Sequence, residues 1–276
     1  MGQTASLRVL RQRLHLSYSQ IHTYLGCSLR YSFHYVYGLA PESVSSSLLL
    51  GTAVHSALAQ YFERLQQSGQ PEQPDSLLEF FRETLKTQIA QSTLPVNYKS
   101  EAPHAEALID QGVGLLKAFV ADAGFAGYEV VAVELPLATR LLNPDSSASD
   151  FDLVGAIDLL LRAPDGQLLA IDHKTAKTPY TQLEVDQDLQ LSAYALLLRS
   201  NGYLAADQPL RCGFNVLRKL KTPKIERHQT LRTPEHSARF SRLAHAVLSG
   251  IEAQTYLPCP GWLCSDCPFK QACQSW

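Results

Sequence analysis

Apolar positions recur every three or four residues along most of the first 125 residues, which predicts a largely helical N-terminal part. Ser17 and Gln20 form a capping-box pattern, and the apolar stripe that follows predicts a helix that ends at Gly38. Similar stripes predict three more helices, one beginning near residue 51 and two spanning 76–89 and 101–122.

From residue 128 the pattern changes to alternation of apolar and polar positions, which is typical of β-strands. Strands are expected at 128–141, 151–162, 168–175, 210–217 and 224–231. A polar linker is expected at 143–150, one helix at 186–199, and a last helix that begins after Thr233. This order predicts an α/β fold in which helices flank a central mixed β-sheet.

Composition and charge limit the classes of function that the chain could have. The chain has 276 residues, of which 45% are hydrophobic and 18% charged, so it can bury a core. Its net charge of -2 provides no chain-wide positive field, and any nucleic-acid contact must be local. No apolar run approaches the roughly 18 residues of a membrane span, and no signal segment is visible. We therefore expect a cytoplasmic protein without membrane contact.

We expect a single domain over 1–276. Its helical N-terminal part covers about 16–125, its core about 126–232, and its C-terminal helix and cysteine cluster about 233–276.

A short hairpin is expected to bring three charged side chains together. Residues 163–167 suit a three-residue turn closed between the first and the last of them. Asp158 then lies directly opposite Asp172, and strand alternation places Lys174 on the same side. The other side is expected to be apolar and to contain Ile157, Leu159, Leu161, Leu169 and Ile171.

Two carboxylates this close repel each other unless a cation lies between them, and oxygen ligands favour Mg²⁺ or Mn²⁺. A lysine beside such a metal could act on its bound water, which is the apparatus for hydrolysing a phosphodiester. The alternative is a cross-strand salt cluster in which Lys174 neutralises one acid. His55 could complete the metal shell, although a histidine on an apolar helix face is usually a core residue.

Together with Gln190 and Tyr194, which share one helix face, these residues resemble the PD-(D/E)XK nuclease superfamily in its RecB-type branch. The family pattern is Gly-x-x-x-His, Gly-x-x-Asp, Asp-x-Lys and Gln-x-x-x-Tyr, and it appears in that order at 51–55, 155–158, 172–174 and 190–194.

The resemblance implies a restriction-endonuclease-like core. His55, Asp158 and Asp172 would bind the metal, with a backbone carbonyl of Ile171 or His173 as a further ligand. Asp158, Asp172 and Lys174 would be catalytic, and Gln190 and Tyr194 would contact or position DNA. Glu134 stands where the family often has another acid on the preceding strand.

Three cysteines within ten residues predict a metal site in a chain without secretion signals, namely Cys264, Cys267 and Cys273. Four thiolates suit a [4Fe–4S] cluster or a zinc ion. The predicted helix that bears Cys27 resembles the N-terminal helix of the iron–sulfur nucleases of the AddB and CRISPR-adaptation kinds. This resemblance implies Cys27 as fourth ligand and iron–sulfur before zinc. Cys259 is the alternative fourth ligand, and Cys212 is expected in the core.

The last two strands carry a cluster of basic residues: Arg211, Arg218, Lys219, Lys221, Lys224, Arg227 and Arg232. We expect Lys219, Lys221 and Lys224 to hold DNA phosphates along this edge, which would make binding independent of sequence and sensitive to salt. The alternative is an ordinary solvated hairpin.

The resemblance favours a metal-dependent deoxyribonuclease, an exonuclease that acts on single-stranded DNA ends in repair or recombination. One alternative is a CRISPR-adaptation nuclease that trims fragments for integration. Another is a non-catalytic iron–sulfur subunit that binds DNA. Candidate partners besides DNA are a helicase and an integrase.

Overall fold

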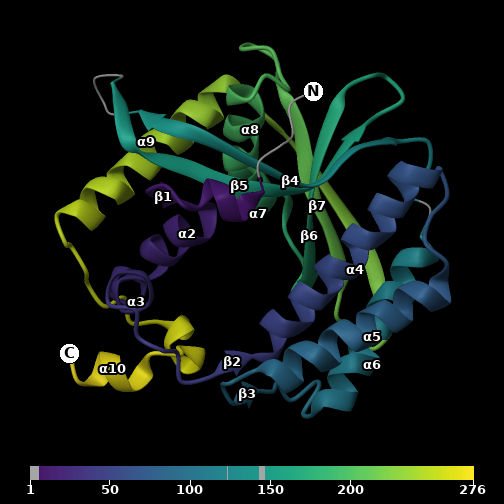
Figure 1. The fold of residues 1–276 in the computed structure, drawn as a ribbon, viewed down its shortest axis with the longest axis horizontal. Helices are drawn as coiled ribbons and strands as arrows, with labels where there is room; N and C mark the ends of the chain where they lie inside the picture. The colour runs from purple at the N-terminus through teal and green to yellow at the C-terminus, as the bar shows by residue number, and fades with distance from the viewer. Residues whose placement is uncertain (1–5, 123, 143–146) are drawn as a thin grey trace.

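The computed structural model describes residues 6–122, 124–142 and 147–276. At its centre lies a mixed sheet in which the strand order is β1-β5-β6-β7-β8, with β4 paired to β5 (Figure 1). The strands are β1 (His15–Leu16), β4 (Glu129–Leu142), β5 (Ala148–Arg162), β6 (Leu168–Ala176), β7 (Leu210–Arg218) and β8 (Lys224–Arg232). β1 is parallel to β5 and β6 to β7, whereas the other pairs are antiparallel.

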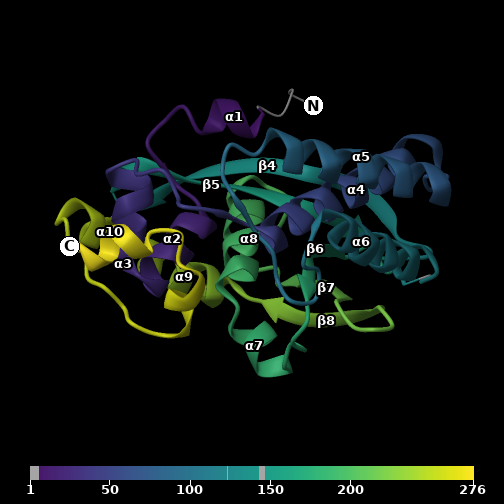
Figure 2. The same ribbon diagram turned by 90° about the horizontal axis from the view of Figure 1, so that it is seen from below.

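Helices cover both faces of this sheet (Figures 1 and 2). Helices α4 (Ser46–Ser68), α5 (Pro74–Gln91) and α6 (Ala105–Val120) pack on one face. Helices α2 (Tyr18–Gly26), α8 (Leu189–Ser200) and α9 (Pro234–Glu252) pack on the other. The predicted α/β fold with a central mixed sheet flanked by helices is confirmed.

Short elements complete the chain. They are α1 (Leu7–Leu10), α3 (Ser28–Tyr31), the π-helix η1 (Ser32–Val36), β2 (Val44–Ser45), β3 (Val96–Asn97), α7 (Gln182–Gln187), the 3-10 helix η2 (Trp262–Asp266) and α10 (Lys270–Gln274). No helix in the described part of the chain is long and apolar enough to cross a membrane.

The predicted hairpin register is confirmed where β5 and β6 pair. The backbone hydrogen bond that closes the 163–167 loop is 2.9 Å long, and the ladder runs to the pair of Leu159 and Ile171. Asp158 and Asp172 come next in each strand, one position beyond the end of the ladder. The two strands therefore separate at the two carboxylates.

One apolar assignment is wrong. Ile157 lies in the cluster under α8, whereas Leu159 lies in the cluster under α4. Glu134 of β4, which is opposite Asp158, has a φ of 45°, in the left-handed region that a residue with a side chain rarely adopts. At this irregular residue the apolar side chains of β4 and β5 switch from one face of the sheet to the other. Strict alternation along the strands therefore fails there.

Two predicted helices are each divided. The helix expected up to Gly38 breaks at Cys27, whose φ of -165° and ψ of 105° are extended, and continues as α3 and η1. The helix expected at 186–199 breaks at Asp188, which caps α8 by accepting a hydrogen bond from Leu191 N. In addition, α4 begins at Ser46 rather than near 51, and α6 begins four residues later than predicted. Of the expected linker at 143–150, residues 143–146 lie outside the described residues.

The C-terminal tail packs against the N-terminal helices. Leu29 N donates to Leu257 O at 3.1 Å, and Glu42 N donates to Pro268 O at 2.8 Å. Phe33 and Phe269 join Leu29 in a small buried cluster. Sequence-distant segments are thus tied together beside α3 and α10 (Figure 1).

Candidate functional site

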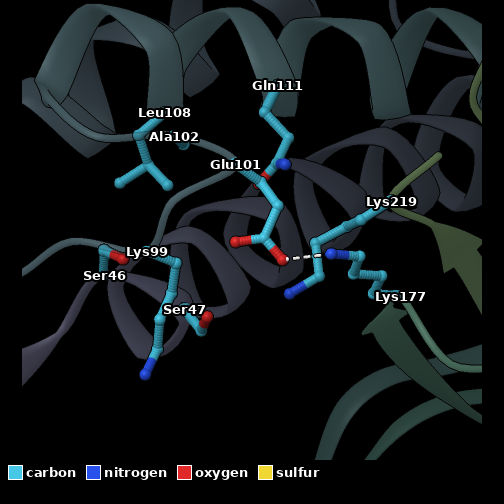
Figure 3. Close-up of a pocket in the computed structure, with 9 residues that line it drawn as sticks. All are labelled: Ser46, Ser47, Lys99, Glu101, Ala102, Leu108, Gln111, Lys177 and Lys219. Atoms are coloured by element: carbon cyan, nitrogen blue, oxygen red, sulfur yellow. Dashed lines mark hydrogen bonds and ion pairs between the residues drawn. The ribbon is translucent and has the colours of Figure 1, made fainter. Parts of the chain in front are cut away.

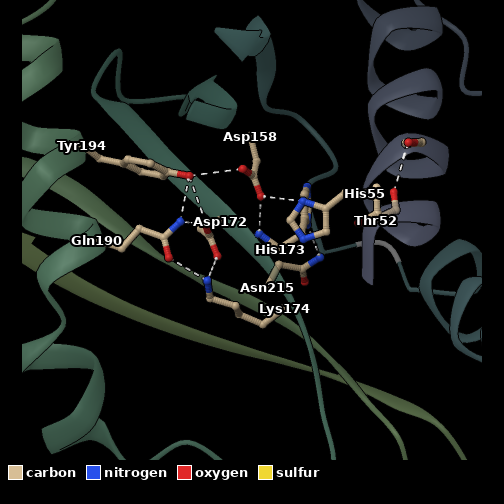
Figure 4. A network of polar contacts seen from close by, with 10 residues as sticks. Thr52, His55, Asp158, Asp172, His173, Lys174, Gln190, Tyr194 and Asn215 are labelled. Atoms are coloured by element: carbon tan, nitrogen blue, oxygen red, sulfur yellow. Dashed lines mark hydrogen bonds and ion pairs between the residues drawn. The ribbon is translucent and has the colours of Figure 1, made fainter. Parts of the chain in front are cut away.

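Asp158 and Asp172 meet where β5 and β6 separate, as the hairpin predicted (Figure 4). Oδ2 of Asp158 accepts a hydrogen bond from His173 N at 2.9 Å. The Tyr194 hydroxyl, from α8, lies 3.1 Å from Asp158 Oδ1 and 3.0 Å from Asp172 Oδ1. Burial, and then the two carboxylates, raise the pKa of Tyr194, so it remains a protonated donor that bridges the two acids.

Lys174 is held on the same side of the hairpin as predicted. Its Nζ lies 2.7 Å from Asp172 Oδ2 and donates to Gln190 Oε1 at 2.7 Å. Gln190 in turn donates to Asp172 through Nε2. Burial lowers the pKa of Lys174, but the contact with Asp172 outweighs burial and raises that pKa overall. The side chain is therefore an ammonium group whose position Gln190 fixes.

His55 and Glu134 complete a donor set around Asp158. His55 Nδ1 lies 3.2 Å from Asp158 Oδ2. The ligand atoms of His55, Glu134 and Asp158 all lie within 4.8 Å of one another, and no other such group of three occurs among the described residues. Burial lowers the pKa of His55, which favours a neutral imidazole with a free lone pair.

The electrostatics of this set fit a divalent cation. Burial, and then the charge of Asp172, raise the pKa of Asp158 well above its ordinary value. Burial and the same carboxylate also raise the pKa of Glu134. Neighbouring acids that repel each other this way are stabilised in their charged form by a positive ion between them. Carboxylate oxygens with one imidazole nitrogen are suitable ligands for Mg²⁺ or Mn²⁺.

The imidazole of His173 takes no part in this donor set. It is stacked on Phe62 of α4, with ring centres 5.7 Å apart, and its Nδ1 lies 3.1 Å from Asn215 Nδ2. The ring therefore belongs to the packing between β6, β7 and α4. Only the backbone carbonyl of His173 or Ile171 stays a candidate ligand.

A groove of about 1030 Å³ opens over the acidic centre. Among the side chains that line it are Tyr18, Thr52, His55, Glu63, Glu134 and Lys174. They come from α2, α4, β4 and β6, so both helical layers contribute to the groove. Of the acidic centre, His55, Glu134, Lys174 and Gln190 line this groove, so an extended ligand in it could reach these side chains.

Close packing fixes α8, which carries Gln190 and Tyr194. A side chain at Gly155 would place its Cβ 2.9 Å from Leu197 of α8, so glycine permits this approach of β5 to the helix. The guanidinium of Arg232 is fully buried and donates to Val185 O at 2.8 Å and to Asp188 O at 3.0 Å. The end of β8 is thereby joined to the start of α8.

The predicted basic edge is only partly present. Arg218 and Arg232 are buried, which contradicts their expected exposure. Arg218 and Lys224 pair with Glu226, Arg227 pairs with Asp122, and Arg211 pairs with Asp165. Lys221 is exposed, and Lys219 lines a small pocket beside α4. Most of these basic side chains therefore form ion pairs within the protein and do not present a continuous positive edge.

The cysteines of the tail lie beside Cys27. All six cysteines of the chain are free, and Cys212 is buried in the core as expected. A cavity of about 210 Å³ is lined by Cys27, Cys259, Cys264, Cys267 and Cys273. Burial, and then the neighbouring Cys267, Cys27 and Cys264, raise the pKa of Cys273. The four predicted ligands thus surround one space, with Cys259 at the same cavity.

Glu134 and the groove-lining Glu63 are the functional candidates that residue patterns alone do not reveal. Glu134 follows a strand alternation that gives no sign of its left-handed φ, and only the family resemblance singled it out. Glu63 looks like any solvated residue of a helix, because its approach to Glu134 depends on how α4 packs against β4.

Comparisons with known proteins identify the family of the chain. A family model for the PD-(D/E)XK nuclease superfamily matches residues 15–274. No curated protein matches the chain significantly. A crystal structure of a "Putative exonuclease" from Eubacterium rectale is similar in fold, with 15% identity, coverage of 97% of this chain and 92% of that chain, and a TM-score of 0.55.

The crystal structure of SSO0001 covers 97% of this chain and 95% of its own at 14% identity, but its TM-score of 0.34 is too low to support an argument. The family match spans nearly the whole chain and includes the paired aspartates, the lysine and the helix that carries Gln190 and Tyr194. The chain therefore belongs to the PD-(D/E)XK nuclease superfamily.

Proposed function

We propose that the protein is a metal-dependent deoxyribonuclease that degrades single-stranded DNA from an end, in DNA repair or recombination. The observation that carries this proposal is the pair of Asp158 and Asp172, bridged by Tyr194 and faced by Lys174, beside an open groove that His55, Glu134 and Lys174 line. The preference for single-stranded ends rests on the RecB-type motif pattern of the sequence.

Each side chain of the centre has a distinct task in this proposal. Asp158, Asp172 and His55, with Glu134, would hold Mg²⁺ or Mn²⁺. When bound, such an ion supplies a Lewis acid and a water of lowered pKa. Lys174 places its ammonium where negative charge develops on the phosphate oxygens. Hydrogen bonds from Tyr194 hold the two carboxylates, and Gln190 holds the lysine. The charged groups are therefore already in position before the substrate binds.

The test is digestion of linear single-stranded DNA labelled at one end, with Mg²⁺ or Mn²⁺ and with EDTA as control. Labelling each end in turn reports polarity, and a circular strand of the same sequence reports internal cutting. We expect metal-dependent release of short products from the linear strand and no loss of the circle. A chain that cuts neither strand under any metal would refute the nuclease proposal.

We further propose that Cys27, Cys264, Cys267 and Cys273 hold a [4Fe–4S] cluster. All four line the same cavity, and the other three cysteines raise the pKa of Cys273, which supports this ligand set. The preference for iron–sulfur over zinc rests on the resemblance of the sequence to the iron–sulfur nucleases.

Replacing Cys27 with serine is expected to remove most of the iron from anaerobically purified protein, because the cluster loses one of its four thiolates. The matched Cys259→Ser variant is expected to retain about four iron atoms per chain. Iron and zinc content per chain would be measured by elemental analysis. Full iron in the Cys27→Ser protein would contradict the assignment, and one zinc without iron would select the alternative metal.

A further inference from the structure

A second pocket lies at the N-terminal end of α4, beside the groove (Figure 3). Its volume is about 40 Å³, and its polar lining consists of Ser46, Ser47, Lys99, Glu101, Lys177 and Lys219, with Gln111 above them. Ser47 also lines the groove, so the two spaces adjoin. None of the three lysines takes part in the acidic centre.

Ser46 is the feature that points to a ligand. Its side chain is 1% exposed, and its Oγ has no hydrogen-bond partner. A buried hydroxyl without a partner is costly, and such groups are nearly always satisfied by protein, water or a ligand. Ser46 also begins a helix of 23 residues, whose N-terminal backbone groups attract anions. The neighbouring Ser45 already caps Ser47 N, at 3.3 Å.

The charge of the pocket is positive once its ion pairs are considered. Lys177 lies 2.7 Å from Glu101, and Lys99 lies 2.7 Å from Asp266. Lys219 forms no ion pair within the described ranges. Burial lowers the pKa of Lys219; the charge of Glu101 opposes this effect, and Lys177 and Lys99 add to it. Lys219 is therefore a cationic side chain near a helix N-terminus that has no ion pair of its own among the described residues.

We propose that this pocket holds a phosphate group of the DNA strand, beyond the scissile phosphate at the carboxylates. Lys219 would pair with the phosphate, and the Ser46 hydroxyl would donate to it. Ser46 precedes His55 by nine residues of α4, which is roughly 13 Å along the helix. Lys219 N donates to Ala176 O, just beyond Lys174 on β6. The inference rests on the proposed nuclease function, because it assigns a subsite to that substrate.

The first test measures binding to a fluorescent single-stranded oligonucleotide in EDTA, where cleavage does not interfere. Lys219→Ala is expected to weaken binding about ten-fold and to reduce the logarithmic salt dependence by about one phosphate. Ser46→Ala is expected to weaken binding about three-fold without lowering the melting temperature, because its hydroxyl has no partner to lose. Lys117→Ala, an exposed lysine of α6, is the matched control.

Equal affinities and salt slopes for Lys219→Ala, Lys117→Ala and wild type would overturn the inference. A Ser46→Ala variant that melts at lower temperature and binds DNA normally would also overturn it, since the hydroxyl would then serve the fold. Failure of the wild type to bind DNA at all would instead refute the proposed function.

The second test locates the phosphate. Oligonucleotides carrying one neutral methylphosphonate linkage, at each position in turn, are cleaved by wild type and by Lys219→Ala. We expect one position near the cut at which the neutral linkage slows wild type about ten-fold and leaves the variant unaffected. Substrates with a 5′-phosphate or a 5′-hydroxyl distinguish a terminal phosphate from an internal one. An equal effect of the neutral linkage in both proteins at every position would reject the subsite.

Discussion

Replacing Asp172 with asparagine is expected to lower the rate of DNA cleavage by about 1000-fold or more. The substitution keeps the size of the side chain but removes a charge that faces Lys174 at 2.7 Å and an oxygen that we propose binds the metal. The amide would also present donors toward Lys174 or Gln190, which already donate to this carboxylate. Losing several kcal/mol of transition-state stabilisation corresponds to this fall in rate. Single-turnover cleavage of end-labelled DNA measures it.

The matched control is Asp207→Asn, which removes one exposed acid from the loop before β7. It is expected to cleave DNA at the wild-type rate, and circular dichroism would establish that both variants are folded. An Asp172→Asn protein that kept more than a tenth of the wild-type rate would show that catalysis occurs elsewhere.

The position of Asp172 could be predicted from sequence because it depends on local structure. Turn chemistry at 163–167 sets the pairing, and the period of two along a strand then decides which side chains share a face. Asp172 follows Asp158 by only 14 positions, and no other element is needed to bring them together. Local rules failed at Ile157, where the left-handed φ of Glu134 interrupts the strand pair.

The rest of the site is made by packing between distant elements, for which residue patterns alone give no distance. His55 and Tyr194 approach the same carboxylate from helices on opposite faces of the sheet. Helix spacing made both residues candidates and the family resemblance assigned their roles, but only the structure brings them together. The helix break at Asp188 sets where α8 begins, and it depends partly on the buried Arg232 of a strand 44 residues later.

The number of basic residues in the last hairpin overestimated its exposed positive charge, again because distant segments pack against it. The partners that neutralise Arg227 and Arg211 come from segments outside the hairpin, at Asp122 and Asp165. A count along one segment cannot include such pairs. Conversely, Lys219 becomes a candidate only because the packing of α4 places a buried hydroxyl in the lining of the same pocket.

Replacing Asp158 with asparagine is expected to raise the melting temperature of the metal-free protein at neutral pH. Burial, and then Asp172, raise the pKa of Asp158, so folding favours its protonated form. The stability that this group contributes is complete below its unfolded pKa of about 3.9 and is lost as the pH rises through the higher folded pKa. The variant should therefore gain at least about 2 °C over wild type near pH 8, and nothing near pH 4.

Saturating Mg²⁺ is expected to reverse this order. An ion that binds only the folded wild type adds about 2.7 kcal/mol at a concentration 100-fold above its Kd, whereas the variant lacks one ligand oxygen and gains much less. Thermal melts with and without Mg²⁺, with Asp207→Asn as control, would measure both effects. If Asp158 only belonged to a salt cluster around Lys174, its loss would lower the melting temperature under both conditions. A reversed order of melting temperatures therefore identifies a metal centre, whose carboxylates destabilise the fold until a cation binds. A salt cluster would instead stabilise the fold without a cation.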